Sequence, residues 1–124
     1  MTAIDIVREW YSSGDPAFLA EDIEWRVLPT FPGGGIYHGR DAVVNEFFPI
    51  VKGRFASYVT TPERFVADGD AVVSMGIYQV ESVGSDKREI RFAHFWHVRD
   101  GLISYFEQVA DTAAINALLT GNHE

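Results

Sequence analysis

The chain has no cysteine, no long uncharged hydrophobic run and few basic residues. Without cysteine it has no disulfide, no thiolate nucleophile and no zinc site built on sulfur, which fits a reducing compartment. The N-terminal stretch MTAIDIVREWYSSGD mixes charged with apolar residues and so lacks the apolar core of a signal peptide. No apolar run approaches the ~20 residues that a transmembrane helix needs. We therefore expect a soluble, cytoplasmic protein.

Positive charge is also scarce. The sequence has 10 lysines and arginines against 18 aspartates and glutamates, which gives a formal net charge of −8. A nucleic-acid backbone would be repelled by this charge, and so would an anionic membrane surface. We expect neither nucleic acid nor membrane as a partner.

Aromatic residues, by contrast, are plentiful. The 124 residues include 3 tryptophans, 5 tyrosines and 9 phenylalanines, and 47% of the chain is hydrophobic. This length fits a single domain over residues 1–124. Large rings form cores and also wall ligand cavities, so their number favours a pocket for a small hydrophobic ligand.

The first half of the chain predicts helices around one strand. Ile4, Val7 and Tyr11 recur at helical spacing, widened by Ile6 and Trp10, and Gly14 is typical of a helix end. The stretch TFPGGGIYHG is too rich in glycine for regular structure and is expected to form a flexible loop. His38 lies in it, as an exposed loop histidine rather than as part of a lid over the cavity mouth. The expected elements are helices over 2–13, 16–20 and 39–51, a strand over 22–29 and a loop over 30–39.

From residue 55 the apolar period changes to two, which predicts strands. Two hairpins are indicated, one turning at Asp68-Gly69 and one at Asp100-Gly101. A last helix over 111–122 is expected to begin with Asp111 as N-cap and to stop at Gly121. Helices gathered on one face of a curved antiparallel meander define an α+β domain.

Several stretches in this order resemble the NTF2-like superfamily, and within it the SnoaL-like and ketosteroid-isomerase-like proteins. They are YSSGD, LAEDIEWRV, IYHGRDAV, RFVADGDAVV and FAHFWHVRDGLI followed by DTAAI. The resemblance implies a cone-shaped curved antiparallel sheet wrapped around N-terminal helices, a cystatin-like α+β barrel with a deep apolar pocket. It also implies a homodimer packed through the outer sheet face. Because the superfamily holds enzymes and non-enzymes, it does not fix the function.

The strand over residues 91–98 contains two histidines of opposite parity. Alternation places His94 on one face and His97 on the other, so they make a poor metal-chelating pair. By resemblance, the position that carries an inward acid in ketosteroid isomerases falls at or next to His94. We predict that His94 faces the pocket, where an imidazole moves protons near neutral pH. The alternative is a hydrogen-bonded histidine of the cavity wall without a chemical role.

The register of the last hairpin decides the neighbour of His94. A two-residue turn puts Arg99 opposite Leu102 and His94 opposite Glu107. A turn with Gly101 as a bulge is favoured, because it keeps the charged Glu107 off the pocket face. In that register the pocket face comprises Phe92, His94, Trp96, Ser104, Phe106 and Gln108.

The sequence departs from the related enzymes at their carboxylates. The cyclase-like proteins have an inward aspartate where the favoured register places Gln108, which cannot take a proton. The isomerase base is replaced by Val27-Leu28-Pro29, whereas Tyr11 is a candidate for the isomerase's tyrosine hydroxyl. The resemblance therefore does not imply a steroid-isomerase mechanism. Arg91, on the wrong parity from His94, also argues against an epoxide hydrolase.

The first functional hypothesis is a cofactor-independent isomerase, cyclase or lyase acting on a small hydrophobic carbonyl compound, with no metal and no cofactor. The alternatives are a non-catalytic binding module for a small hydrophobic ligand and a dimerisation domain. Two or more ionisable side chains in contact inside the cavity favour an enzyme, and a lone His94 favours binding. The proposed catalytic residues are His94 as acid/base, Gln108 as orienting group and Tyr11 as hydroxyl donor, and the proposed pocket wall is Trp10, Trp25, Phe92, Trp96 and Phe106.

Overall fold

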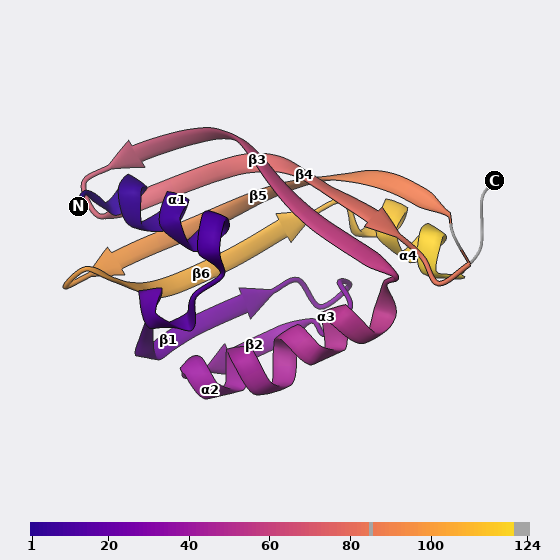
Figure 1. The fold of residues 1–124 in the computed structure, drawn as a ribbon, viewed down its shortest axis with the longest axis horizontal. Helices are drawn as coiled ribbons and strands as arrows, with labels where there is room; N and C mark the ends of the chain where they lie inside the picture. The colour runs from indigo at the N-terminus through magenta and orange to yellow at the C-terminus, as the bar shows by residue number, and fades with distance from the viewer. Residues whose placement is uncertain (85, 121–124) are drawn as a thin grey trace.

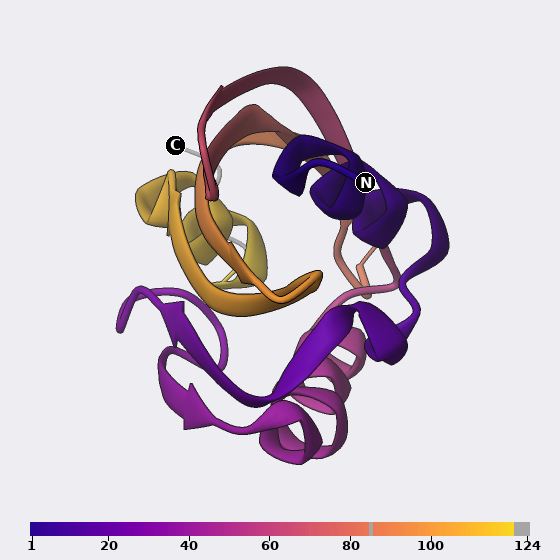
Figure 2. The same cartoon turned by 90° about the vertical axis from the view of Figure 1, so that its left-hand side faces the viewer.

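One curved six-stranded sheet organises the described part of the chain, residues 1–84 and 86–120 of a computed structural model (Figure 1). The strand order is β2-β1-β6-β5-β4-β3, and every neighbouring pair is antiparallel except β1 and β6. The end-on view shows the sheet curling toward α1 and the α2–α3 segment (Figure 2). The predicted α+β class with a curved sheet around N-terminal helices is confirmed. The elements are α1 (Ala3–Ser13), β1 (Leu19–Val27), β2 (Gly35–His38), α2 (Arg40–Ala42), α3 (Phe48–Arg54), β3 (Ser57–Asp68), β4 (Ala71–Glu81), β5 (Lys87–Arg99), β6 (Leu102–Ala110) and α4 (Thr112–Thr120).

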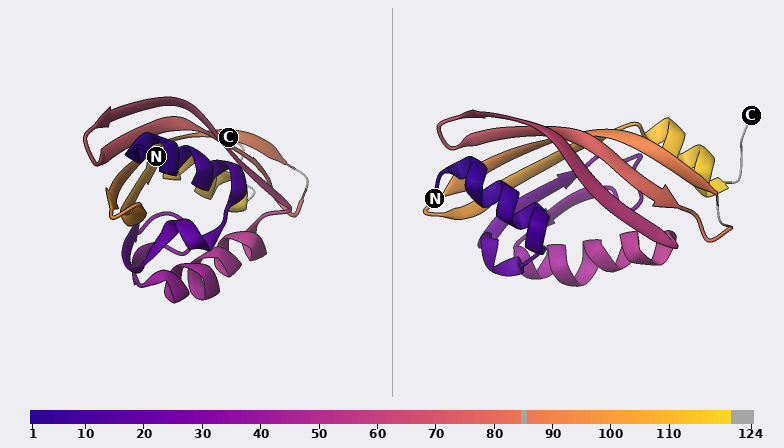
Figure 3. Two further views of the ribbon diagram at one scale, coloured as in Figure 1. Left: turned by 60° about the vertical axis from the view of Figure 1, so that its left-hand side comes forward. Right: turned by 45° about the horizontal axis from the view of Figure 1, so that its top comes forward.

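The first helix forms where the sequence predicts it. Thr2 caps its start in a reciprocal capping box with Asp5, and Gly14 ends it in the left-handed region at a φ of 62°. Its buried face presents Trp10 to the concave side of the sheet. Figure 3 shows this helix lying across the strands, which brings its last turn over the interior.

Two expectations for the following segment are wrong. Only one 3₁₀ turn, Pro16–Phe18, forms in place of a helix over 16–20, because Leu19 is drawn into the core and starts β1 opposite Ile103 of β6. The glycine-rich stretch 30–39 is not all loop. Its second half is β2, an edge strand that pairs with β1 and includes His38, so the expected flexible loop is a short strand there.

The third predicted helix is present but irregular, and it runs further than residue 51. A π-helical segment, Val43–Phe47, separates α2 from α3, and α3 begins with Pro49 in its first turn. Proline has no N–H to donate, so a wide turn before it avoids an interrupted hydrogen-bond ladder. The α2–α3 segment lies opposite α1 across the interior (Figure 3).

The last hairpin combines features of both registers weighed from the sequence. Arg99 lies opposite Leu102, and Asp100 and Gly101 both have positive φ, at 52° and 77°. This is a two-residue turn with a primed geometry, so the favoured bulged turn is wrong. The ladder shifts only after the turn, between His97 and Val98, and this shift brings His94 opposite Gln108.

Because of this shift, Phe106 and Gln108 face the pocket as predicted. Ser104, however, does not face the pocket, because its hydroxyl donates to the carbonyl of His97 on the exposed side. Glu107 lies opposite Phe95, away from the interior. The sequence therefore predicted the right neighbour for His94 with the wrong turn.

The first β-hairpin and the C-terminal helix agree with their predictions. Asp68 pairs with Ala71 across a two-residue turn that contains Gly69. The carboxylate of Asp111 accepts from the backbone N–H of Ala114 at 3.1 Å, which confirms the N-cap. The predicted stop, Gly121, lies outside the described residues. No helix in the described ranges is long and apolar enough to cross a membrane.

Candidate functional site

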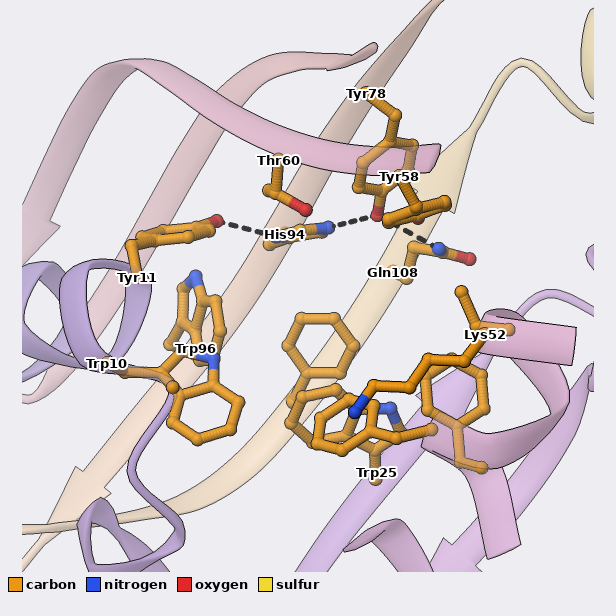
Figure 4. Close-up of a pocket in the computed structure, with 15 residues that line it drawn as sticks. Trp10, Tyr11, Trp25, Lys52, Tyr58, Thr60, Tyr78, His94, Trp96 and Gln108 are labelled. Atoms are coloured by element: carbon orange, nitrogen blue, oxygen red, sulfur yellow. Dashed lines mark hydrogen bonds between the residues drawn. The ribbon is translucent and has the colours of Figure 1, made fainter. Parts of the chain in front are cut away.

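A cavity of about 280 Å³ lies between the concave face of the sheet and the helices α1 and α3 (Figure 4). Aromatic rings make up most of its wall, and Lys52 is the one charged side chain among the described lining residues. Such a mostly apolar hollow with a few polar groups is typical of small-molecule sites. The lining residues are Trp10, Tyr11, Gly14, Trp25, Phe47, Phe48, Val51, Lys52, Tyr58, Thr60, Tyr78, His94, Trp96, Phe106 and Gln108.

His94 is the polar centre of this wall. It is buried, with 4% of its surface exposed, and both its ring nitrogens contact a phenol. The Nδ1 atom lies 2.6 Å from the Tyr11 hydroxyl, and the Nε2 atom lies 2.5 Å from the Tyr78 hydroxyl. The three side chains come from α1, β5 and β4, so the array forms only when the helix lies across the sheet.

The array extends through further hydrogen bonds at both ends. On the Tyr11 side, its hydroxyl lies 2.7 Å from Ser74 Oγ, which also accepts from Trp96 Nε1 at 2.8 Å. On the other side, the Gln108 amide donates to the Tyr78 hydroxyl at 2.9 Å. Period-two alternation on β4, β5 and β6 brings these side chains to the same face. The result is a continuous buried network that holds His94 in one orientation.

Burial sets the protonation states in this network. Desolvation lowers the pKa of His94 well below its ordinary value of 6.5, so the imidazole is neutral at physiological pH. Desolvation likewise raises the pKa of both Tyr11 and Tyr78, so these phenols keep their protons. A neutral imidazole has one N–H donor and one acceptor nitrogen, so one phenol donates to it and it donates to the other.

Two proton arrangements therefore satisfy the network. In one, Tyr78 donates to Nε2 and Nδ1–H donates to Tyr11. In the other, Tyr11 donates to Nδ1 and Nε2–H donates to Tyr78, which leaves the Tyr78 proton for a further acceptor. Every group is neutral in both arrangements, so neither creates a buried charge, which low-dielectric surroundings penalise. Passage from one to the other along the array requires a proton to enter at one phenol and another to leave at the other.

The structure brings together most of the residues that the sequence singled out. His94, Gln108, Tyr11, and the wall candidates Trp10, Trp25, Trp96 and Phe106 all line the cavity, whereas Phe92 does not and packs behind His94 with ring centroids 4.0 Å apart. The imidazole is not alone, because two ionisable phenols contact it. The catalytic roles assigned to these residues stay predictions.

Sequence reasoning missed the contribution of β4. Ser74 and Tyr78 of β4 complete the network. Tyr58 of β3 and Lys52 of α3, which the sequence also did not single out, join the wall. Alternation over Val72, Ser74, Gly76, Tyr78 and Val80 already indicated one inward face of this strand. Which inward residues meet His94 depends on the β4–β5 register, in which Ser74 lies opposite His94, and the sequence did not specify that register.

A curved sheet closed by helices over an aromatic cavity defines a cone-shaped α+β protein with an internal cavity. The chain matches the family model of the SnoaL-like domain over residues 13–106. It therefore belongs to the SnoaL-like family, as the resemblance implied. A comparison with functionally curated proteins gave no significant match.

Solved structures with the same fold cover nearly the whole chain. An NTF2-like protein of unknown function from Burkholderia pseudomallei K96243 is 29% identical, with a TM-score of 0.88 over 95% of this chain and 97% of its own. TerC, co-crystallised with polyporic acid, is 26% identical, with a TM-score of 0.85 over 95% and 98%. A putative SnoaL-like polyketide cyclase from Jannaschia sp. CCS1 shares the fold at 11% identity, with a TM-score of 0.82 over 98% and 92%.

Proposed function

We propose that this protein binds a small hydrophobic carbonyl compound in its cavity and acts on it as a cofactor-independent isomerase, cyclase or lyase. The observation that carries the proposal is the Tyr11–His94–Tyr78 array, in which both nitrogens of a buried neutral imidazole contact phenols at 2.6 and 2.5 Å. Two phenols and an imidazole in mutual contact at a cavity supply proton donors and acceptors to a bound molecule.

In the proposed mechanism the phenols meet the substrate and His94 connects them. The Tyr78 hydroxyl donates its proton toward a substrate carbonyl oxygen, whose negative charge grows as the adjacent carbon is deprotonated. A substrate carbonyl that accepts the Tyr78 proton selects the second proton arrangement, in which Nε2–H of His94 donates to Tyr78, over the one with the proton on Nδ1. Nε2–H then replaces the proton lost by Tyr78, and the Tyr11 hydroxyl gives its proton to Nδ1. Tyr11, which also lines the cavity, receives the proton that leaves the substrate carbon. This step is balanced in protons, needs no carboxylate and leaves the ring protonated on Nδ1. The reverse relay, which returns a proton to a substrate carbon, restores the starting arrangement.

The family membership supports a small-molecule role, and one of the similar structures supports it further. TerC was co-crystallised with polyporic acid, and at 26% identity its alignment covers 95% of this chain. Its likeness favours an organic ligand for this cavity too, of a size that an aromatic wall can enclose.

The experiment that tests the chemistry measures deuterium uptake. A panel of small ketones is incubated with the protein in deuterated water, and exchange at the carbon next to the carbonyl is followed by NMR. We expect exchange with at least one ketone. In Tyr78→Phe and His94→Gln the rate of exchange is expected to fall by about 10²-fold or more, which is the size of effect that loss of a catalytic proton donor has. Tyr105→Phe, which removes a hydroxyl bonded to Glu107, is the matched control and retains the wild-type rate. Unchanged exchange in His94→Gln contradicts the mechanism.

A second candidate function is a non-catalytic binding module. It is favoured by the absence of any carboxylate among the described cavity-lining residues, since related enzymes use one as their base. If this function holds, a ligand bound tightly by the wild-type protein is recovered unchanged and no ketone of the panel exchanges. A role purely in dimerisation is less well supported, because it leaves the polar network at the cavity without a purpose.

A further inference from the structure

Two buried side-chain polar atoms in the described residues have no hydrogen-bond partner, and both belong to cavity-lining residues. They are Trp25 Nε1, a donor, and Gln108 Oε1, an acceptor. Each of these residues has only 3% of its surface exposed. A buried polar group left unpaired costs about 1–3 kcal/mol, so native proteins rarely keep one without a reason. A ligand in the cavity is a reason that applies to both atoms.

Neither atom is free to turn to another partner. The Trp25 indole is stacked on Phe106 with ring centroids 3.8 Å apart, and the rings of Trp10 and Phe48 meet it edge-on at 6.2 and 5.7 Å. The Gln108 amide is held by its donation to Tyr78, so its oxygen points away from that hydroxyl (Figure 4). The donor and the acceptor are therefore in place before a ligand arrives, which lowers the cost of binding.

Lys52 adds a positive charge at the same cavity. Its side chain is exposed and, within the described residues, takes part in no ion pair. Figure 4 draws it extending from α3 toward the region of Trp25. In a chain of net charge −8, the one charged lining residue is a cation, which favours an anionic group on the ligand.

We infer that Trp25 and Gln108 determine the specificity of the cavity, and that together with Lys52 they select a planar aromatic hydroxy acid. An ionised oxygen of the ligand accepts from Trp25 Nε1 close to Lys52, and a hydroxyl donates to Gln108 Oε1. The aromatic body fills the space among the rings. This inference rests on the ligand-binding part of the proposed function and is independent of its chemistry.

The test uses naphthalene-based probes with the whole protein labelled with ¹⁵N. The probes are 6-hydroxy-2-naphthoic acid, 3-hydroxy-2-naphthoic acid, 6-methoxy-2-naphthoic acid and 2-methylnaphthalene. Affinities come from titration of the NMR signals, and the Trp25→Phe variant assigns the Trp25 indole N–H. We expect at least one hydroxy acid to bind about tenfold more tightly than the methoxy acid, and the methoxy acid about tenfold more tightly than 2-methylnaphthalene. The Trp25 indole signal moves downfield with the acids and not with the hydrocarbon.

Variants separate the contacts. Trp25→Phe and Lys52→Met each reduce the preference for acids over 2-methylnaphthalene, and Gln108→Leu removes the preference for hydroxy over methoxy acid. Trp10→Phe replaces another lining tryptophan and lowers all affinities without changing these ratios. Binding of all probes with equal affinity and an unmoved Trp25 signal overturns the inference and leaves the proposed function standing. Failure of every probe to bind the wild-type protein overturns both.

Discussion

Gln108 lies directly opposite His94 in the β5–β6 ladder, yet its amide hydrogen-bonds to Tyr78 on the far side of that histidine. Because the Tyr78 oxygen accepts from Gln108 at 2.9 Å, the tyrosine's own proton is free to go to His94 Nε2 at 2.5 Å. The remaining proton of the neutral ring then resides on Nδ1 and is donated to Tyr11. Gln108 thus acts on the histidine through a tyrosine and favours one tautomer.

This relationship predicts the tautomer of His94. In the free protein at neutral pH, ¹⁵N NMR of the histidine rings is expected to show His94 protonated on Nδ1. Gln108→Leu removes the donor to Tyr78, so the second arrangement becomes competitive and the His94 nitrogen shifts move toward averaged values. Gln79→Leu, at an exposed glutamine of β4, is the control and leaves the His94 shifts in place. An Nε2-protonated ring in the wild-type protein contradicts the prediction.

The buried imidazole also predicts a pH-dependent stability. Burial lowers the pKa of His94 below the 6.5 of the unfolded chain, so between these two values the unfolded state binds a proton that the folded state does not. The free energy of unfolding therefore falls as pH drops below 6.5, with a slope from this group of at most about 1.4 kcal/mol per pH unit. Above that pH both states hold a neutral ring and the contribution is flat.

Urea unfolding between pH 5 and 8 measures this effect. His94→Gln removes the titrating group, so the stability difference between wild-type protein and variant shrinks as pH is lowered from 7 to 5. The matched control His97→Gln, at an exposed histidine of the same strand, keeps the wild-type dependence on pH. A gap between wild type and His94→Gln that stays constant over this range shows that the ring is not held neutral by burial.

The inward face of β4–β6 was only partly predictable from the sequence. The parity of β5 correctly placed His94 and Trp96 inside, because side-chain alternation along one strand is a local property. The position of Gln108 beside His94 depends on an irregularity at His97/Val98, which no turn residue signals. The predicted neighbour was right because two departures from the expected hairpin cancelled. The turn has two residues and no bulge, and the β5–β6 pairing shifts between His97 and Val98.

Elsewhere, long-range pairing overrode local signals. The stretch Gly35–His38 reads as loop, but it pairs with β1 and its Tyr37 hydroxyl donates to the Gly33 carbonyl at 2.6 Å. Leu19 reads as helix, but it is fully buried in the first strand. Partners far apart in the sequence decide such segments, and Tyr78 was missed as a partner of His94 for the same reason.

Strands β3 and β4 approach each other so closely at Gly76 that any side chain at this position is expected to destabilise the fold. A Cβ atom at this position of β4 would lie 2.8 Å from the Cα of Pro62 and 3.0 Å from the ring of Phe92, which stacks on His94. Gly76→Ala is expected to lower the free energy of unfolding by about 1–3 kcal/mol through overpacking. Gly53→Ala is the matched control. A Cβ there meets nothing within 4 Å, so in helix α3 it stabilises by up to about 1 kcal/mol. Equal effects of the two substitutions would show that the strands can move apart.

The outer face of the sheet carries the last prediction, a homodimer. Phe95 is 39% exposed on this face, and partly exposed apolar side chains adjoin it on β4 and β5, whereas Glu107 lies opposite it on β6. A contiguous exposed apolar surface on a sheet favours pairing with an identical surface about a two-fold axis. Its other members are Val73, Met75, Ile77, Ala93 and Val109.

Light scattering coupled to size exclusion is expected to give twice the chain mass for the wild-type protein at micromolar concentration. Phe95→Glu buries a charge in the proposed interface and yields the monomer, because an unpaired buried carboxylate costs several kcal/mol. Val83→Glu places the same charge at a side chain that is 78% exposed in the β4–β5 turn, and it leaves the dimer intact. Since Phe95 points away from the cavity, the Phe95→Glu monomer is also expected to keep the wild-type affinity for cavity ligands. A wild-type monomer, or a dimer that survives Phe95→Glu, places any self-association on another surface.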